Sequence, residues 1–81
     1  MSESKKWIVD WFIKNGNLNE KDIMEKLDDN YIENGFIDSF GFIQLLSDIS
    51  ETFGTEFADQ DLDDEKFFTI NGLAILIGEF I

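Results

Sequence analysis

Apolar side chains recur along this chain at intervals of three and four residues, which is the spacing of a helix that buries one side. The clearest case runs from Ser39 to Phe53, where polar side chains occupy the opposite face. The apolar stripe there consists of Phe42, Leu45, Leu46, Ile49 and Phe53. No alternating run is long enough for a strand, so the sequence predicts an all-α fold.

The segments near the two ends of the sequence show the same spacing. From Ser4 to Lys14 the apolar residues predict a helix, and Asn15-Gly16 supplies a stop. Thr69 can cap a closing helix. The inward positions are Ile8, Trp11 and Phe12 in the first segment and Ile70, Leu73, Ala74, Ile77 and Phe80 in the second. These two helices and the one from Ser39 to Phe53 are the principal helices of the predicted fold.

The connections between them are predicted to be shorter and less regular. Asn19 precedes two acidic residues, as an N-cap does, so either a short helix or an ordered loop seats Ile23 on the core. From residue 28 to 38, apolar side chains pin a loop that leads to Ser39.

The segment from 55 to 66 is too acidic for a long buried helix. We expect a loop with Phe57 inserted, followed by a short helix around Leu62. The prediction as a whole is a four-helix bundle with three principal helices plus one short helix.

The composition favours a small unit with an aromatic core. The chain has 81 residues, no proline, no repeat and no linker-like tract, so residues 1–81 are expected to form a single domain. A core of that size is only just sufficient unless it is rich in large apolar groups. Nine Phe and two Trp supply these groups, since each large aromatic side chain buries about 150–250 Å².

Charge limits the classes of partner. Six Lys against eighteen Asp and Glu give a net charge of −12, which repels phosphate backbones and anionic membrane surfaces. Nucleic-acid binding is therefore not expected, and the natural partner is a basic patch on another protein, unless the acidity serves solubility alone. No apolar stretch is long enough to span a bilayer, so no stable membrane insertion is expected.

The absence of cysteine excludes a disulfide framework and thiolate chemistry. Residues 1–6 lack the apolar core of a signal peptide, so we expect a cytoplasmic protein, and a monomer. The acidic run at 59–65 matches only the first part of an EF-hand calcium loop. Asp64 stands where that loop needs Gly, and Ile70 where it needs Glu, so no metal site is predicted.

Asp38-Ser39 begins the predicted helix that ends at Phe53, in a chain without histidine, cysteine or arginine. A helix N-terminus carries unpaired N–H groups and partial positive charge, which favour a phosphate ester on a serine at that position. The alternative is an ordinary helix cap. A catalytic serine would need an adjacent base such as histidine, so an enzyme is not expected.

The segment from Ile37 to Leu46, which reads Ile-Asp-Ser-Phe-Gly-Phe-Ile-Gln-Leu-Leu, resembles the phosphopantetheine attachment motif of acyl carrier proteins. The order of predicted elements along nearly the whole chain is similar too. The resemblance implies that Ser39 carries 4'-phosphopantetheine, which a phosphopantetheinyl transferase transfers from coenzyme A. It also implies that Asp38 helps the transferase to recognise Ser39. It also implies a non-catalytic carrier that presents a thioester-bound acyl or aminoacyl group to a ligase and to acyl-transferring enzymes.

Within that family, the chain looks more like D-alanyl carrier proteins than carriers of fatty acid biosynthesis at Gly41, Gln44, Leu45, Leu46 and the Phe53-Gly54 ending. Fatty-acid carriers more often have acidic residues at the positions of Gly41 and Gln44. The start of this helix face is nearly neutral, which puts charge-driven docking on fatty-acid synthase enzymes in doubt. The cargo stays open among fatty acyl, D-alanyl, other aminoacyl and polyketide-type units. A stiff aromatic core favours a small cargo left in solvent.

Phe40 lies off the apolar stripe beside Ser39, so it either anchors a partner or folds back over the preceding loop. The predicted docking face comprises Phe40, Gln44, Ser47, Asp48 and Glu51, extended by Glu56 and Asp59. For each acid the alternative is a solvated helix face. The rival function is a cofactor-free acidic helical module that docks through Phe40.

Overall fold

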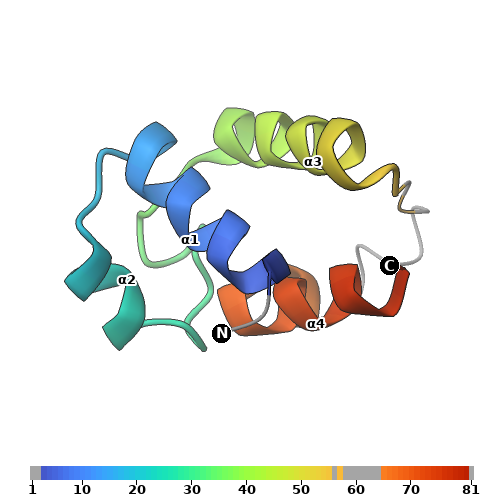
Figure 1. Cartoon of the computed structure of the whole chain (residues 1–81). Coiled ribbons are helices and arrows are strands. Elements are labelled where there is room, and N and C mark those ends of the chain that lie inside the picture. Colours follow the sequence, from blue (N-terminus) through green and yellow to red (C-terminus); the bar gives the residue numbers. More distant parts are fainter. Residues whose placement is uncertain (1–2, 56, 58–64, 81) are drawn as a thin grey trace.

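The computed structural model describes residues 3–55, 57 and 65–80. Its elements are α1 (Glu3–Asn15), α2 (Glu20–Glu25), α3 (Ser39–Phe53), the 3-10 helix η2 (Glu65–Phe68) and α4 (Ile70–Phe80) (Figure 1). These residues contain no strand, and α1, α3 and α4 are the three principal helices, so the predicted all-α fold is confirmed. The predicted helix around Leu62, the extensions Glu56 and Asp59 and the side chain of Phe80 lie outside the described residues.

The helices are joined in two ways. In Figure 1, α3 runs along the top, α4 along the bottom and α1 between them. Within the described residues, close backbone packing joins α1 to α4 and α2, and α4 to η2. Large side chains join α3 to the rest: the rings of Trp7 and Phe53 meet edge to face at 5.4 Å, and those of Phe42 and Phe68 stack at 5.4 Å. These aromatic contacts and the buried side chains of Leu45 and Ile49 therefore hold α3 on the core.

Local capping explains where the helices begin and end. The Asn19 side chain accepts a hydrogen bond from the Asp22 N–H at 2.8 Å, so the short helix is confirmed and the ordered-loop alternative is wrong. Thr69 Oγ1 accepts from the Gly72 N–H at 2.9 Å and caps α4, as predicted. After α3, Gly54 adopts a left-handed φ of 70°, which glycine tolerates best.

The core is aromatic, as the composition predicts. Phe12 lies against Tyr31, with ring centroids 5.3 Å apart, and Phe57 meets Phe67 edge to face at 4.6 Å. The predicted insertion of Phe57 is thus confirmed. The buried apolar residues are Ile8, Val9, Trp11, Phe12, Ile23, Tyr31, Ile37, Leu45, Ile49, Phe67, Ile70, Leu73, Ala74 and Ile77.

The sequence interpretation placed a short helix around Leu62, outside the described residues, and did not predict η2 at Glu65–Phe68. The reason is tertiary: the hydroxyl of Tyr31 donates a hydrogen bond to the Phe67 carbonyl, and its backbone N–H donates to the Phe68 carbonyl at 3.0 Å. The pattern of residues 65–68 alone cannot predict these hydrogen bonds, because Tyr31 lies far away in the chain.

None of the described helices is long and apolar enough to cross a membrane.

Candidate functional site

An ordered loop presents Ser39 at the start of α3. The side-chain oxygen of Asn30 accepts hydrogen bonds from the backbone N–H groups of Ile32 and Glu33, at 2.9 and 3.0 Å. Further along, the N–H of Ile37 donates to the Tyr31 carbonyl at 3.2 Å, which closes the loop on itself. The apolar side chains of this loop pack on the core, as predicted, so the position of Ser39 follows from the core.

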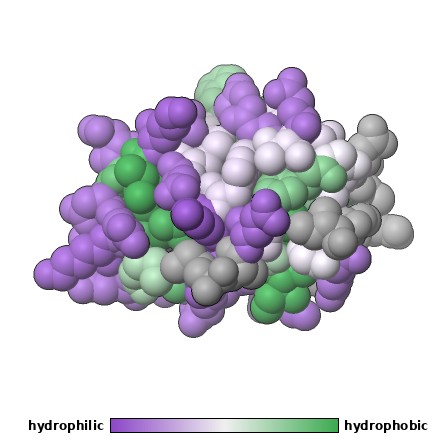
Figure 2. Space-filling model, in the orientation of Figure 1, coloured by the Kyte–Doolittle hydropathy of each residue, from purple (hydrophilic) through white to green (hydrophobic). Residues whose placement is uncertain are grey.

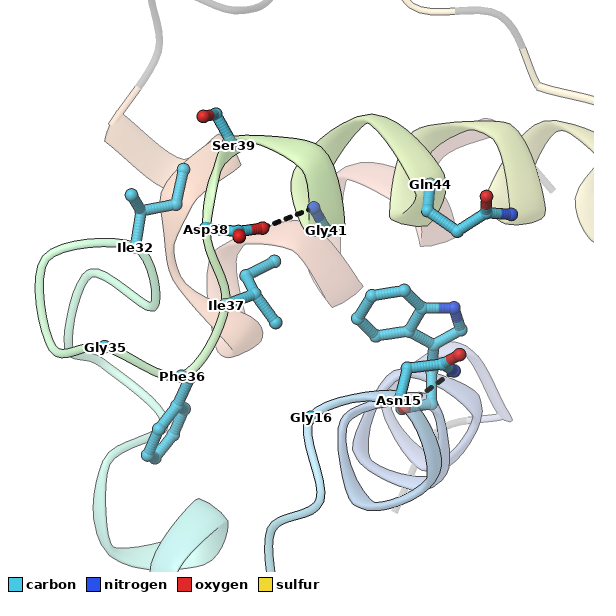
Figure 3. Close-up of a pocket in the computed structure, with 11 residues that line it drawn as sticks. Asn15, Gly16, Ile32, Gly35, Phe36, Ile37, Asp38, Ser39, Gly41 and Gln44 are labelled. Atoms are coloured by element: carbon cyan, nitrogen blue, oxygen red, sulfur yellow. Dashed lines mark hydrogen bonds between the residues drawn. The ribbon is translucent and has the colours of Figure 1, made fainter.

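Asp38 and Ser39 have different roles at the start of α3. Asp38 Oδ1 accepts from the Gly41 N–H at 2.8 Å and is therefore the N-cap (Figure 3). Ser39 is the exposed first residue of α3, and its hydroxyl points away from that cap. An ordinary cap thus accounts for Asp38 but leaves the Ser39 hydroxyl unused.

Two backbone donors remain beside the Ser39 hydroxyl. The Phe42 N–H bonds to the Asp38 carbonyl at 3.0 Å, whereas the N–H groups of Ser39 and Phe40 make no hydrogen bond within the part of the chain that the structure describes. Free N–H groups and the positive end of a helix attract an anion. A phosphate ester on Ser39 fits this arrangement.

An open groove of about 800 Å³ adjoins the serine. It lies between the end of α1, the loop before α3 and the first turns of α3 (Figure 3). Its lining residues are Trp11, Asn15, Gly16, Ile32, Gly35, Phe36, Ile37, Asp38, Ser39, Gly41 and Gln44. An added Cβ at Gly41 would come within 3.1 Å of the Ile37 Cβ, so the missing side chain lets that loop lie close to α3.

Asp48 contradicts the alternative of a solvated helix face, whereas its place in the docking face stays a prediction. It is half-buried, and its two carboxylate oxygens accept from Trp11 Nε1 at 2.7 Å and from Gln44 Nε2 at 2.8 Å. The buried indole N–H needs an acceptor, and that signal was readable in the sequence, because Trp11 lies on the inward face of the first predicted helix. The choice of Asp48 depends on how α1 and α3 are placed.

Phe40 is 83% exposed, so the alternative in which it folds back over the loop is wrong. Ile43, which the sequence interpretation left out, is 64% exposed on the same helix. Its position off the apolar stripe was the available signal. Ser47 and Glu51 are exposed as predicted, whereas Gln44 is exposed but lines the groove toward α1.

The helix that begins at Ser39 carries acidic residues and no basic one. No lysine occurs between Ser39 and Phe53. In the face shown in Figure 2, hydrophilic residues cover much of the surface and hydrophobic residues form separate areas.

Residues 3–55, 57 and 65–80 contain no group of three or more His, Cys, Asp or Glu placed to hold a metal ion. The acidic run at 59–64 lies outside those residues.

A family model described as a phosphopantetheine attachment site matches residues 8–77, a range that begins in α1, ends in α4 and contains Asp38-Ser39. The comparisons with curated proteins and with solved structures find no match. The resemblance to D-alanyl carriers in particular stays a prediction.

Proposed function

We propose that this chain, which belongs to the phosphopantetheine attachment family, bears 4'-phosphopantetheine on Ser39 and presents a thioester-bound acyl or aminoacyl group to partner enzymes. Domains of this family carry the group covalently on a serine and interact with a modifying transferase and with acyl-handling enzymes. The observation that supports Ser39 is its exposed hydroxyl at the first residue of α3, beside two free N–H groups and unused in capping.

The chain's own contribution to attachment is small. The Ser39 oxygen loses its proton and forms the phosphoester bond as the pyrophosphate bond of coenzyme A breaks and adenosine 3',5'-bisphosphate leaves. The transferase has to supply the base because the chain contains no histidine. The N–H groups of Ser39 and Phe40 are positioned to donate to the new phosphate. Once bound, the group supplies a terminal thiol that holds the cargo as a thioester. This division supports a non-catalytic carrier.

The aromatic core supports a small cargo. Phe42 lies 6.2 Å from the ring of Tyr31 and 6.3 Å from that of Phe67, and it stacks on Phe68. An acyl chain entering the bundle between α3 and η2 would have to displace these rings, and dense packing resists that. NMR spectra of a long-chain acylated form should therefore leave the core aromatic signals unmoved. Shifts at Phe42 and Phe67 would contradict the small-cargo proposal.

Partners are proposed to dock on the outer side of α3. Phe40 and Ile43 expose apolar surface there, and Ser47 and Glu51 continue the face. A partner with an apolar pocket bordered by basic residues fits this surface. The transferase, a ligase and acyl-transferring enzymes are the proposed partners. The carrier itself is proposed to be a cytoplasmic, monomeric single domain of residues 1–81.

The first experiment is intact mass after incubation with coenzyme A, magnesium and a promiscuous phosphopantetheinyl transferase. The wild type and Thr52→Ala, which removes an exposed hydroxyl of α3 outside the docking face, should gain one phosphopantetheine. Ser39→Ala should gain none. Absence of any gain with several transferases would favour the cofactor-free docking module, and a gain on Ser39→Ala would assign the attachment to another residue.

A further inference from the structure

We infer that the groove between α1 and the start of α3 is the resting site of the phosphopantetheine arm, so that the arm folds back toward α1 between transfers. The inference rests on the proposed attachment at Ser39. It concerns where the arm lies and not where it is attached, because an arm on Ser39 could equally extend into solvent.

The groove is continuous with the attachment residue. Ser39 and Asp38 form one end of its lining, and Asn15 and Gly16 form the α1 side. Figure 3 shows Gln44 and Asn15 beyond Gly41 and Ile37, on the side toward α1. The Ser39 hydroxyl points outward, and an exposed side chain changes rotamer freely. An arm attached to Ser39, at one end of the groove, can enter the groove by folding back toward α1.

The chemistry of the lining suits the arm. Beyond its phosphate, the arm is an uncharged chain with two amide groups and a dimethyl-substituted carbon. Apart from Asp38, whose carboxylate caps α3, the lining residues are uncharged. The lining contains two amide side chains and several apolar ones, and the groove's volume of about 800 Å³ lies within the range of small-molecule sites, about 300–1,000 Å³.

Two amide oxygens are available to the arm. Asn15 donates through Nδ2 to the Trp11 carbonyl at 3.0 Å, and Gln44 donates through Nε2 to Asp48 at 2.8 Å. Among the described residues, the side-chain oxygens of Asn15 and Gln44 accept no hydrogen bond. Each oxygen can accept from an amide N–H of the arm. Because the nitrogens are held, both side chains are already oriented.

Burial and hydrogen bonds hold two residues of the groove wall in place. Trp11 is 6% exposed, and Asp48 holds its indole N–H at 2.7 Å. Ile37 is 9% exposed and is bonded through its N–H to Tyr31. A preformed surface of this kind binds with little ordering cost, which favours even a weakly held tethered ligand.

NMR of the apo and holo forms tests the inference directly. In the holo form, nuclear Overhauser contacts should join the dimethyl protons of the arm to the Trp11 indole, and the side-chain amide signals of Asn15 and Gln44 should shift. The Trp7 indole, which lies against Phe53, serves as the internal reference and should not move. A fully modified protein without these contacts would overturn the resting site while leaving the attachment on Ser39 intact.

Reactivity of the arm thiol supplies the second readout. Asn15→Phe fills the groove from α1, and Thr52→Phe, an exposed neutral position of α3 outside the groove, is the matched control. An arm that rests in the groove two thirds of the time reacts about threefold more slowly with a thiol reagent than a free arm. We therefore expect about threefold faster reaction of holo Asn15→Phe than of wild type or Thr52→Phe. Equal rates in the three proteins would overturn the inference, and lack of modification would instead count against the proposed function.

Discussion

Tyr31 links the loop before Ser39 to the C-terminal half of the chain. Its side chain is fully buried, its hydroxyl donates to the Phe67 carbonyl, and its backbone bonds to both Phe68 and Ile37. Burial raises the pKa of Tyr31 well above its ordinary value of 10.0. A single residue therefore connects the site, the core and η2.

Tyr31→Phe should show this link in its pH dependence. Near neutral pH the variant should lose about 1–3 kcal/mol of unfolding free energy, because the buried Phe67 carbonyl loses its donor. The pKa of Tyr31 is higher in the folded than in the unfolded state, so its contribution is present below pH 10 and declines as pH rises further. Urea unfolding should show the difference between the two proteins shrinking above pH 10. A difference that stays constant would contradict the burial argument.

Asp48 also has a structural role, because it accepts the hydrogen bond of the Trp11 indole. Asp48→Ala leaves the buried Trp11 indole N–H without its acceptor and should cost about 1–3 kcal/mol of unfolding free energy. Glu51→Ala, which removes an exposed acid from the same helix, should stay within about 0.5 kcal/mol of wild type. Chemical denaturation measures both. Equal effects of the two substitutions would mean that the Trp11 contact adds nothing.

At the scale of the element, α3 combines the site with the exposed face. Asp38 caps its start, Gly54 ends it in the left-handed region, and its inward stripe packs on the core. Because close backbone packing joins the other elements while side chains join α3, its position depends on its aromatic contacts, its buried Leu45 and Ile49 and its caps. Changes at its first turn therefore affect both stability and the presentation of Ser39.

Substitutions of Asp38 separate the cap from recognition by the transferase. Asp38→Ala should lower the unfolding free energy by about 1 kcal/mol, whereas Asp38→Asn keeps a capping oxygen and should be nearly neutral. If the carboxylate is recognised, as the resemblance implies, both variants should be modified more slowly than wild type in the transferase assay. Normal modification of Asp38→Asn would limit the role of Asp38 to capping.

For the molecule as a whole, charge repulsion works against the aromatic core. The net charge of −12 is confined to a molecule whose longest extent is 29 Å. At about 0.01 M salt the screening length is about 30 Å, so the charges repel one another across the whole protein, and at about 0.15 M it falls to about 8 Å.

Salt should therefore raise the melting temperature. In a domain of this size, each 1 kcal/mol of added unfolding free energy raises the melting temperature by about 4–8 °C. We expect a rise of that order between about 0.01 and 0.15 M NaCl, measured by circular dichroism. Magnesium chloride at equal ionic strength is the control for specific cation binding. A melting temperature independent of NaCl would show that the acids are spaced widely enough not to repel.

The sequence alone predicted the principal helices and the caps at Asn19 and Thr69, and it offered a cap at Asp38-Ser39 as an alternative, because helical periodicity and capping act between residues three or four apart. Only the tertiary structure decided the bond from Trp11 to Asp48, the contact of Tyr31 with η2 and the groove beside Ser39. These features join residues far apart in the chain. The sequence shows that a buried donor needs an acceptor, but the packing of the helices decides which residue supplies that acceptor.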